Sequence, residues 1–123
     1  MSSEKLTAFE GKKYLCLETY KKSGQAVKTP VWFVMSNGII YIATAESSGK
    51  VKRLKNNKSV RIVPSSYNGD PKGNWIGGQA FFGNETELNF TMSLRNKKYG
   101  LLSKIIGMFV SKKGKIVSIG IKI

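Results

Sequence analysis

The sequence predicts a mainly β protein, a small closed or nearly closed barrel of six short antiparallel strands with short helices. Stretches of β-branched and aromatic residues recur along the chain, and turn residues separate them. Asn37-Gly38 marks a tight hairpin between two such stretches, because both residues tolerate a positive φ angle. The length of 123 residues suits one domain over residues 1–123, which can bury a core without disulfide bonds.

The expected strands are residues 13–20, 27–35, 39–45, 60–64, 75–82 and 115–123. Alternation in the second strand places Phe33 in the core and Trp32 on the opposite face. Pro30 cannot donate a backbone hydrogen bond, so we expect this strand at a sheet edge or a bulge. Gly77 and Gly78 predict a bulge or the close approach of another group in the fifth strand.

The late part of the chain is mostly helical in pattern over residues 85–109, with an interruption at residues 99–100. Its apolar stretch 101–110 is broken by Ser103 and Lys104 and is far shorter than the roughly 20 residues of a membrane span. We expect this amphipathic stretch to cover the barrel or to lie in a dimer interface. The start of the chain has no apolar core of signal-peptide length, so we expect a soluble, cytoplasmic protein.

The residue inventory excludes several kinds of enzyme. The chain has no histidine and one cysteine, which excludes Ser–His and Cys–His nucleophilic catalysis and the usual zinc sites. Cys16 lies between leucines in an expected strand, so we interpret it as a core residue. The sequence indicates no catalytic residue and no metal ligand. If the protein is an enzyme, a cofactor must carry the chemistry, and hydride transfer needs little acid–base help from the protein.

The net charge of +14 favours an anionic partner. Nucleic acid, an anionic membrane and a phosphorylated or carboxylated cofactor would all meet this requirement. The cations gather at residues 50–58 and 95–98, and none lies from 75 to 94. This spread favours a general basic surface over a focused nucleic-acid stripe, so nucleic acid is the less favoured partner.

The best candidate anion site is the turn before a short helix expected over residues 50–56. Ser47 or Ser48 would be its N-cap, and the free amide groups and dipole at a helix start favour a phosphate. Lys50 and Arg53 are three residues apart and share one helix face. A solvated basic helix face is the alternative interpretation. On the other side of the helix, Val51 and Leu54 would face the core.

A second candidate element is the strand that contains residues 29–33. It could present backbone groups to the edge of a heterocycle and an aromatic side chain to its face. Trp32 is either a wall of the ligand site or part of a dimer interface, and Trp75 has the same ambiguity.

Several short pieces stand in a characteristic order: Tyr14-Leu15 with Thr19, Thr29-Pro30-Val31-Trp32-Phe33, Tyr41-Ile42-Ala43-Thr44, Ser48-Gly49-Lys50-Val51-Lys52-Arg53-Leu54, Asn57 with Val60, Arg61 and Pro64, Gly73 with Trp75-Ile76 and Ala80, and Lys98-Tyr99-Gly100. With this ordered set the chain resembles the pyridoxamine-phosphate-oxidase-like superfamily of flavin-binding split barrels. It looks most like the branch that uses the deazaflavin coenzyme (F-420) or FMN.

The resemblance implies a six-stranded antiparallel split barrel that forms a homodimer, with two cofactors in the clefts between the subunits. Matched to the family, Ser48, Lys50 and Arg53 would hold the cofactor phosphate, and Thr44 and Ser47 would sit beside the ring. The ring itself would be lined by Thr29, Pro30, Val31 and Trp32. Family members often carry cysteine or aspartate after the proline that matches Pro64. Here Ser65 and Ser66 follow it, so the substrate stays unassigned.

Three functions remain open at this point. The leading hypothesis is an oxidoreductase that transfers a hydride between the bound cofactor and a small organic substrate. The others are a non-enzymatic flavin or deazaflavin carrier or sensor and a basic nucleic-acid-binding barrel. The deazaflavin coenzyme is favoured over FMN, since its acidic tail could meet cations just beyond the phosphate site: Lys52, Lys55, Lys58 and Arg61.

Overall fold

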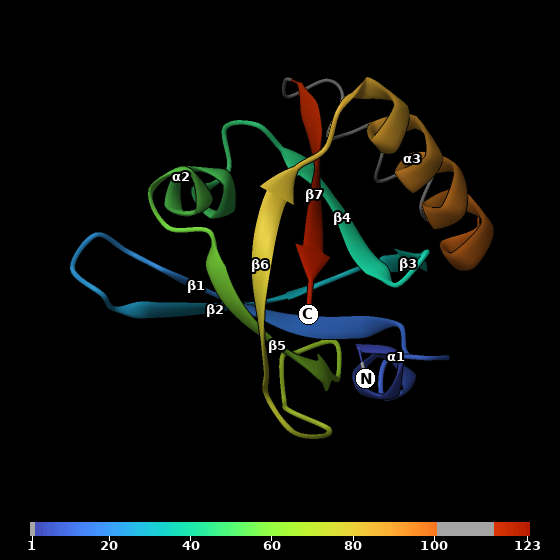
Figure 1. Cartoon of the computed structure of the whole chain (residues 1–123), viewed down its shortest axis with the longest axis horizontal. Helices are drawn as coiled ribbons and strands as arrows, with labels where there is room; N and C mark the ends of the chain where they lie inside the picture. Colours follow the sequence, from blue (N-terminus) through green and yellow to red (C-terminus); the bar gives the residue numbers. More distant parts are fainter. Residues whose placement is uncertain (1, 101–114) are drawn as a thin grey trace.

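The computed structural model describes residues 2–100 and 115–123 and shows one curled antiparallel sheet with helices around it (Figure 1). The elements in chain order are α1 (Ser2–Thr7), β1 (Tyr14–Tyr20), β2 (Ala26–Val31), β3 (Val34–Ser36), β4 (Ile39–Ala45), α2 (Gly49–Asn56), β5 (Ser59–Ser65), β6 (Ile76–Phe82), α3 (Glu85–Tyr99) and β7 (Ile116–Lys122). Within residues 2–100 and 115–123, no helix has the length and apolar character to cross a membrane.

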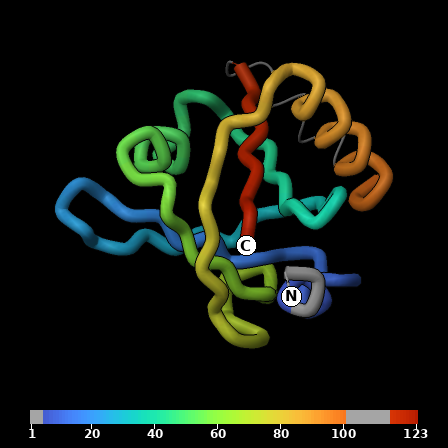
Figure 2. The backbone as a smooth tube through the Cα atoms, in the orientation of Figure 1, coloured from blue at the N-terminus to red at the C-terminus, as the bar shows by residue number. Residues whose placement is uncertain are grey.

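The sheet has the strand order β2-β1-β5-β6-β7-β4-β3, so its two edge strands are neighbours in the chain. The chain leaves one edge at Val31 and enters the other at Val34, and only Trp32 and Phe33 lie between. Figure 2 shows how the backbone curls to bring these edges together. The expected mainly β split barrel is therefore confirmed.

The expected strand count of six is wrong, because the strand expected over residues 27–35 is two strands. β2 pairs with β1, whereas β3 pairs with β4, so the chain has to change partner between them. Alternation alone cannot reveal this break, since apolar residues continue through it. The sequence also did not predict α1.

The late helix ends where its interruption was expected, at residues 99–100. α3 begins after an Asn84 N-cap, whose capping box is completed by Glu87, and ends at Tyr99. Gly100 follows with a φ of 66°, a backbone conformation that glycine adopts without strain. The rest of that expectation, including the stretch 101–110, lies outside the described residues.

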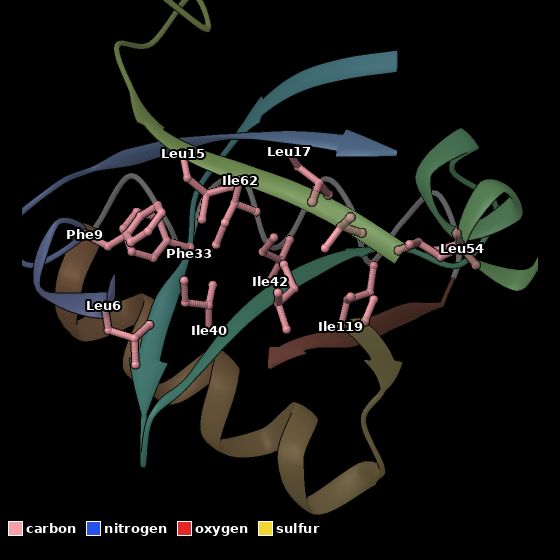
Figure 3. Close-up of a cluster of buried hydrophobic side chains, with 14 residues drawn as sticks. Leu6, Phe9, Leu15, Leu17, Phe33, Ile40, Ile42, Leu54, Ile62 and Ile119 are labelled. Atoms are coloured by element: carbon pink, nitrogen blue, oxygen red, sulfur yellow. The ribbon is translucent and has the colours of Figure 1, made fainter. Parts of the chain in front are cut away.

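The core lies between the two halves of the curled sheet (Figure 3). Leu15, Leu17 and Ile62 from β1 and β5 point toward Ile42 and Ile119 from β4 and β7. Phe33, Val51 and Leu54, which were expected in the interior, are buried in this core. Cys16 is buried too, but on the opposite face of β1, where its sulfur lies near Pro30 and Gly69. Burial of this contiguous apolar surface is the main force that holds the barrel closed.

Two expectations about glycine and proline in strands are confirmed. Pro30 lies in the edge strand β2, where its missing N–H leaves no ladder bond unmade inside the sheet. Gly78 lies where β7 approaches closely, because an added Cβ would stand 2.9 Å from the carbonyl oxygen of Lys122. An added Cβ at Gly77 meets nothing within 4 Å, so this second glycine marks no close approach.

Candidate functional site

The start of α2 has a backbone geometry that favours an anion. Ser48 is the N-cap, which settles the choice between Ser47 and Ser48, and its hydroxyl oxygen accepts from the Val51 amide at 3.3 Å. The amides of Gly49 and Lys50, the first two of the helix, have no acceptor within the helix. The first turn carries no acidic residue, so its positive potential is not neutralised locally.

Arg53 is held over this helix start. Its Nε donates to the hydroxyl of Thr19 at 2.6 Å, and Thr19 is buried in β1. A Cβ at Gly49 would lie 2.8 Å from the Nη1 atom of Arg53, so the guanidinium folds across the first residue of α2. The absence of a side chain at Gly49 makes this approach possible. Arg53 therefore brings a second cationic group to the same helix end.

A cavity of about 240 Å³ lies next to this helix end. Its lining residues come from β1, the end of β2, β4, α2 and α3: Tyr14, Pro30, Val31, Trp32, Ile42, Ala43, Thr44, Lys50 and Arg95. Five residues predicted for the site are among them, namely Pro30, Val31, Trp32, Thr44 and Lys50. The structure thus brings the expected ring wall and one expected phosphate ligand to one space.

The other predicted residues stand at different distances from the cavity. Ser48 is one hydrogen bond away, since the Thr44 hydroxyl donates to its oxygen at 3.4 Å. Arg53 stands over the helix start and does not line the cavity. Thr29, paired with Leu17 in the ladder, and the exposed Ser47 also lie outside the lining.

Four lining residues were not predicted. Tyr14, Ile42 and Ala43 come from strands whose existence was expected, but which of their side chains reach the cavity depends on how the sheet curls. Arg95 comes from the middle of α3, far from the rest in sequence. The one feature of the sequence that could have pointed to Arg95 was its place in the basic cluster at residues 95–98.

Trp32 is held by two side chains of α3. Its indole stacks on the Tyr99 ring, with centroids 4.2 Å apart and planes 7° apart. The Arg95 guanidinium carbon lies over the indole, 5.1 Å from its centroid. Two interpretations were left open for Trp32, and this position agrees with a wall of the cavity. The stack on Tyr99 fixes the side chain there.

The backbone N–H and C=O groups of Phe33 form hydrogen bonds with side chains of the last turn of α3. Its N–H donates to the Tyr99 hydroxyl oxygen at 3.1 Å, and its carbonyl accepts from the Lys98 ammonium at 2.9 Å. The single hydrogen of the Tyr99 hydroxyl is shared between the Lys13 carbonyl at 2.6 Å and the more distant Phe33 carbonyl at 3.1 Å. Burial raises the pKa of Tyr99 to about 12 and lowers the pKa of Lys98 to about 8. These contacts attach α3 to the point where the chain changes sheet partner.

The cavity is cationic and lacks acids. Burial, together with repulsion from Arg53, lowers the pKa of Lys50, and burial lowers the pKa of Arg95. Both groups therefore lose hydration without gaining a carboxylate, because no aspartate or glutamate is among the described lining residues. An anionic ligand would compensate the two cations for the hydration that they lose.

A second basic cluster lies on the outer face of β1 and β5. Arg61 donates to both carboxylate oxygens of Glu18, at 2.8 and 3.0 Å, and Glu18 is only 2% exposed. The hydrogen bonds from Arg61 lower the pKa of Glu18. Arg61 and Lys28 also lie over the ring of Trp75, at 5.1 and 5.3 Å. Arg61 therefore already holds a carboxylate of this chain, and its expected contact with a cofactor tail stays a prediction.

A larger cavity of about 570 Å³ lies at the other helix start, between α3 and β7. Its lining includes Asn84, Glu85 and Ser118. The capping box occupies the amides of Asn84 and Glu87, and the carboxylates of Glu85 and Glu87 put negative charge in the first turn. This helix end therefore does not suit an anion, although its space is greater.

Comparisons with known proteins bear on the fold. No protein-family model and no curated protein sequence matches the chain. Among solved structures, a conserved hypothetical protein from Mycobacterium tuberculosis has a TM-score of 0.74 at 18% identity, over 98% of this chain and 78% of its own. The heme storage protein HutZ from Vibrio cholerae has a TM-score of 0.72 at 14% identity, over 98% of this chain and 87% of its own.

An F-420-H2 dependent reductase has a TM-score of 0.66 at 15% identity, over 89% of this chain and 94% of its own. Similar structures also include a putative pyridoxamine 5'-phosphate oxidase and an FAD-binding protein. The chain therefore has the pyridoxamine 5'-phosphate oxidase-like split-barrel fold, which these flavin-related proteins share. At identities this low, the structural similarity establishes the fold only, and the activity has to be inferred from the site.

The contacts of Tyr99 lead to a stability prediction. The variant Tyr99→Phe keeps the stack on Trp32 but removes the hydroxyl that bonds to Lys13 and Phe33. We expect a loss of about 1 kcal/mol in the free energy of unfolding, measured by urea denaturation, because polar backbone groups lose a partner. Tyr67→Phe is the control, since Tyr67 is 74% exposed. Equal midpoints for both variants would contradict the role given to this hydroxyl.

Proposed function

We propose that this protein is an oxidoreductase that binds the deazaflavin coenzyme (F-420), or FMN, in the 240 Å³ cavity and uses it for hydride transfer to a small organic substrate. The observation that carries the proposal is the meeting of two features in one space. A wall made by Pro30, Val31 and Trp32 adjoins a helix start that bears Ser48 and Lys50. A flat heterocycle with a phosphate on its side chain needs both.

The residues fit such a cofactor in their chemistry. The two free amides at the start of α2, the Lys50 ammonium and the Arg53 guanidinium would hold a phosphate. Thr44 and Ser48 add hydroxyls beside it. The backbone at Pro30, Val31 and Trp32 would define the edge of the ring site.

The part left to this chain in the reaction is binding and orientation. The cofactor, when bound, supplies the hydride chemistry. Among the described lining residues no carboxylate is present, and the chain has no histidine, so acid–base assistance from these two kinds of group is not available at this site. The protein would exclude water and hold the ring and substrate at a fixed distance.

A carrier or sensor without turnover is the second candidate function. The observation that favours it is the same lack of carboxylates and histidine in the described lining, and one protein of similar fold is named as a heme storage protein. The absorbance spectrum of the purified protein distinguishes bound flavin from bound deazaflavin. Loss of the reduced-cofactor signal on addition of acceptor substrates would support an enzyme, and an unchanged signal with every acceptor would support a carrier.

Replacing the cations at α2 tests the cofactor site. Arg53→Ala should weaken FMN binding by about 1.5–3 kcal/mol, the range for hydrogen bonds to charged groups, and Lys50→Ala by somewhat less. Fluorescence titration at low salt measures both. Lys52→Ala is the matched control, because Lys52 lies on the same helix but is exposed. The double variant binding FMN as tightly as the wild type would place the cofactor elsewhere.

The choice between the two cofactors depends on the exposed cations Lys52, Lys55 and Lys58. Their contacts with an acidic tail are screened by salt, whereas the phosphate contacts beside the cavity are screened less. The preference for the deazaflavin coenzyme in the same titration should therefore shrink as ionic strength rises. Tighter binding of FMN at low salt would reverse this choice.

We also propose a homodimer. A cavity of 240 Å³ is smaller than the roughly 300–1,000 Å³ of a typical ligand pocket, so another surface has to cover part of a tricyclic cofactor. A second copy of the chain would supply it. Light scattering of the loaded protein should give about twice 13.6 kDa. A monomer that retains full cofactor affinity would contradict the proposal.

A further inference from the structure

Arg95 is a cation in the cavity that the cofactor phosphate site does not use. It lines the same space as Lys50, but it comes from α3 and lies over the face of Trp32. Among the side chains that the structure describes, its contacts are with the Trp32 ring and the Met92 sulfur, and none is with a carboxylate. Residues 101–114 contain no aspartate or glutamate, so that segment offers no carboxylate either.

The geometry of Arg95 is fixed in advance. Tyr99 is tied by its hydroxyl to the Phe33 and Lys13 backbones, Trp32 stacks on Tyr99, and the Arg95 guanidinium lies over Trp32. A guanidinium that lies over an aromatic ring keeps its N–H donors pointing outward in its own plane. Side-chain freedom that would otherwise be lost on binding is already restricted.

We propose that Arg95 binds a carboxylate group of the molecule held in this cavity. This inference rests on the proposed function, in which the phosphate occupies the α2 end. The planar fork of arginine matches a carboxylate through two parallel hydrogen bonds, and partial burial strengthens them. A ligand with an anionic group at each of the two cationic ends, Lys50 and Arg95, would neutralise both.

Two molecules could supply this carboxylate, and Arg95 would bind it in the same way in either case. It belongs either to a carboxylated organic substrate beside the ring or to the acidic tail of the deazaflavin coenzyme. FMN has no carboxylate, so a comparison of FMN, the deazaflavin coenzyme and a simple aromatic carboxylate separates the two sources.

The experiment uses the full chain with the substitution Trp75→Phe. Trp32 is then the one remaining tryptophan, because the sequence has two, and its emission reports ligands next to Arg95. Dissociation constants are measured for benzoate, for its neutral analogue benzamide, for FMN and for the deazaflavin coenzyme. The variants are Arg95→Lys, which keeps the charge but loses the fork, and Arg95→Gln. Lys97→Gln, at an exposed position of the same helix, is the control.

We expect the unsubstituted site to bind benzoate more tightly than benzamide, and both Arg95 variants to lose about tenfold or more in benzoate affinity. FMN affinity should fall by far less, because FMN has no carboxylate to meet the guanidinium fork. If the Arg95 variants also lose affinity for the deazaflavin coenzyme, the carboxylate belongs to the cofactor tail. If their affinity for this coenzyme is kept, the carboxylate belongs to the substrate.

Unchanged affinities of the Arg95 variants for benzoate and the deazaflavin coenzyme would overturn the inference while the proposed function stands. Failure of the unsubstituted site to bind either carboxylate probe would overturn it as well. If FMN and the deazaflavin coenzyme both fail to bind, the proposed function fails, and the benzoate titration still decides the role of Arg95.

Discussion

The structure depends on hydrogen bonds to the backbone N–H and C=O groups of Phe33, at the point where the chain crosses from one edge of the sheet to the other. Between β2 and β3 the residue leaves both ladders, yet its side chain is 1% exposed. Buried N–H and C=O groups without partners would cost free energy, and Lys98 and Tyr99 supply those partners. This requirement ties the last turn of α3 to the crossing, and α3 in turn places Tyr99 and Arg95 against Trp32.

The candidate site follows from this arrangement. The crossing gives the cavity its Pro30-to-Trp32 wall, and α2 brings a helix start beside the end of β4. The result is a cationic space without acids among its described lining residues, which suits the binding of an anionic cofactor better than acid–base catalysis by the protein. The barrel core, which lies between the sheet halves, holds these parts at fixed positions.

Local signals predicted the parts of the fold whose causes are local. The Asn37-Gly38 hairpin, the bounds of β4 and the cap of α2 at Ser48 depend on residues a few positions apart. The strand break at residues 32–33 and the place of Arg95 depend on Lys98 and Tyr99, which are 65 and 66 residues from Phe33. Periodicity carries no information on such contacts, so the strand was predicted unbroken and Arg95 was given no role. The family resemblance named Pro30, Trp32 and Lys50 correctly as neighbours, but their roles are still predictions.

Amide chemical-shift mapping tests most directly whether the cavity beside α2 is the ligand site. On addition of FMN to the ¹⁵N-labelled chain, the largest shifts should fall on the amides of Gly49 and Lys50 and on the indole N–H of Trp32, while the indole N–H of Trp75 stays in place. Shifts gathered instead around Gly83 and Ser118, at the larger cavity between α3 and β7, would contradict the assignment. So would a spectrum that FMN does not change.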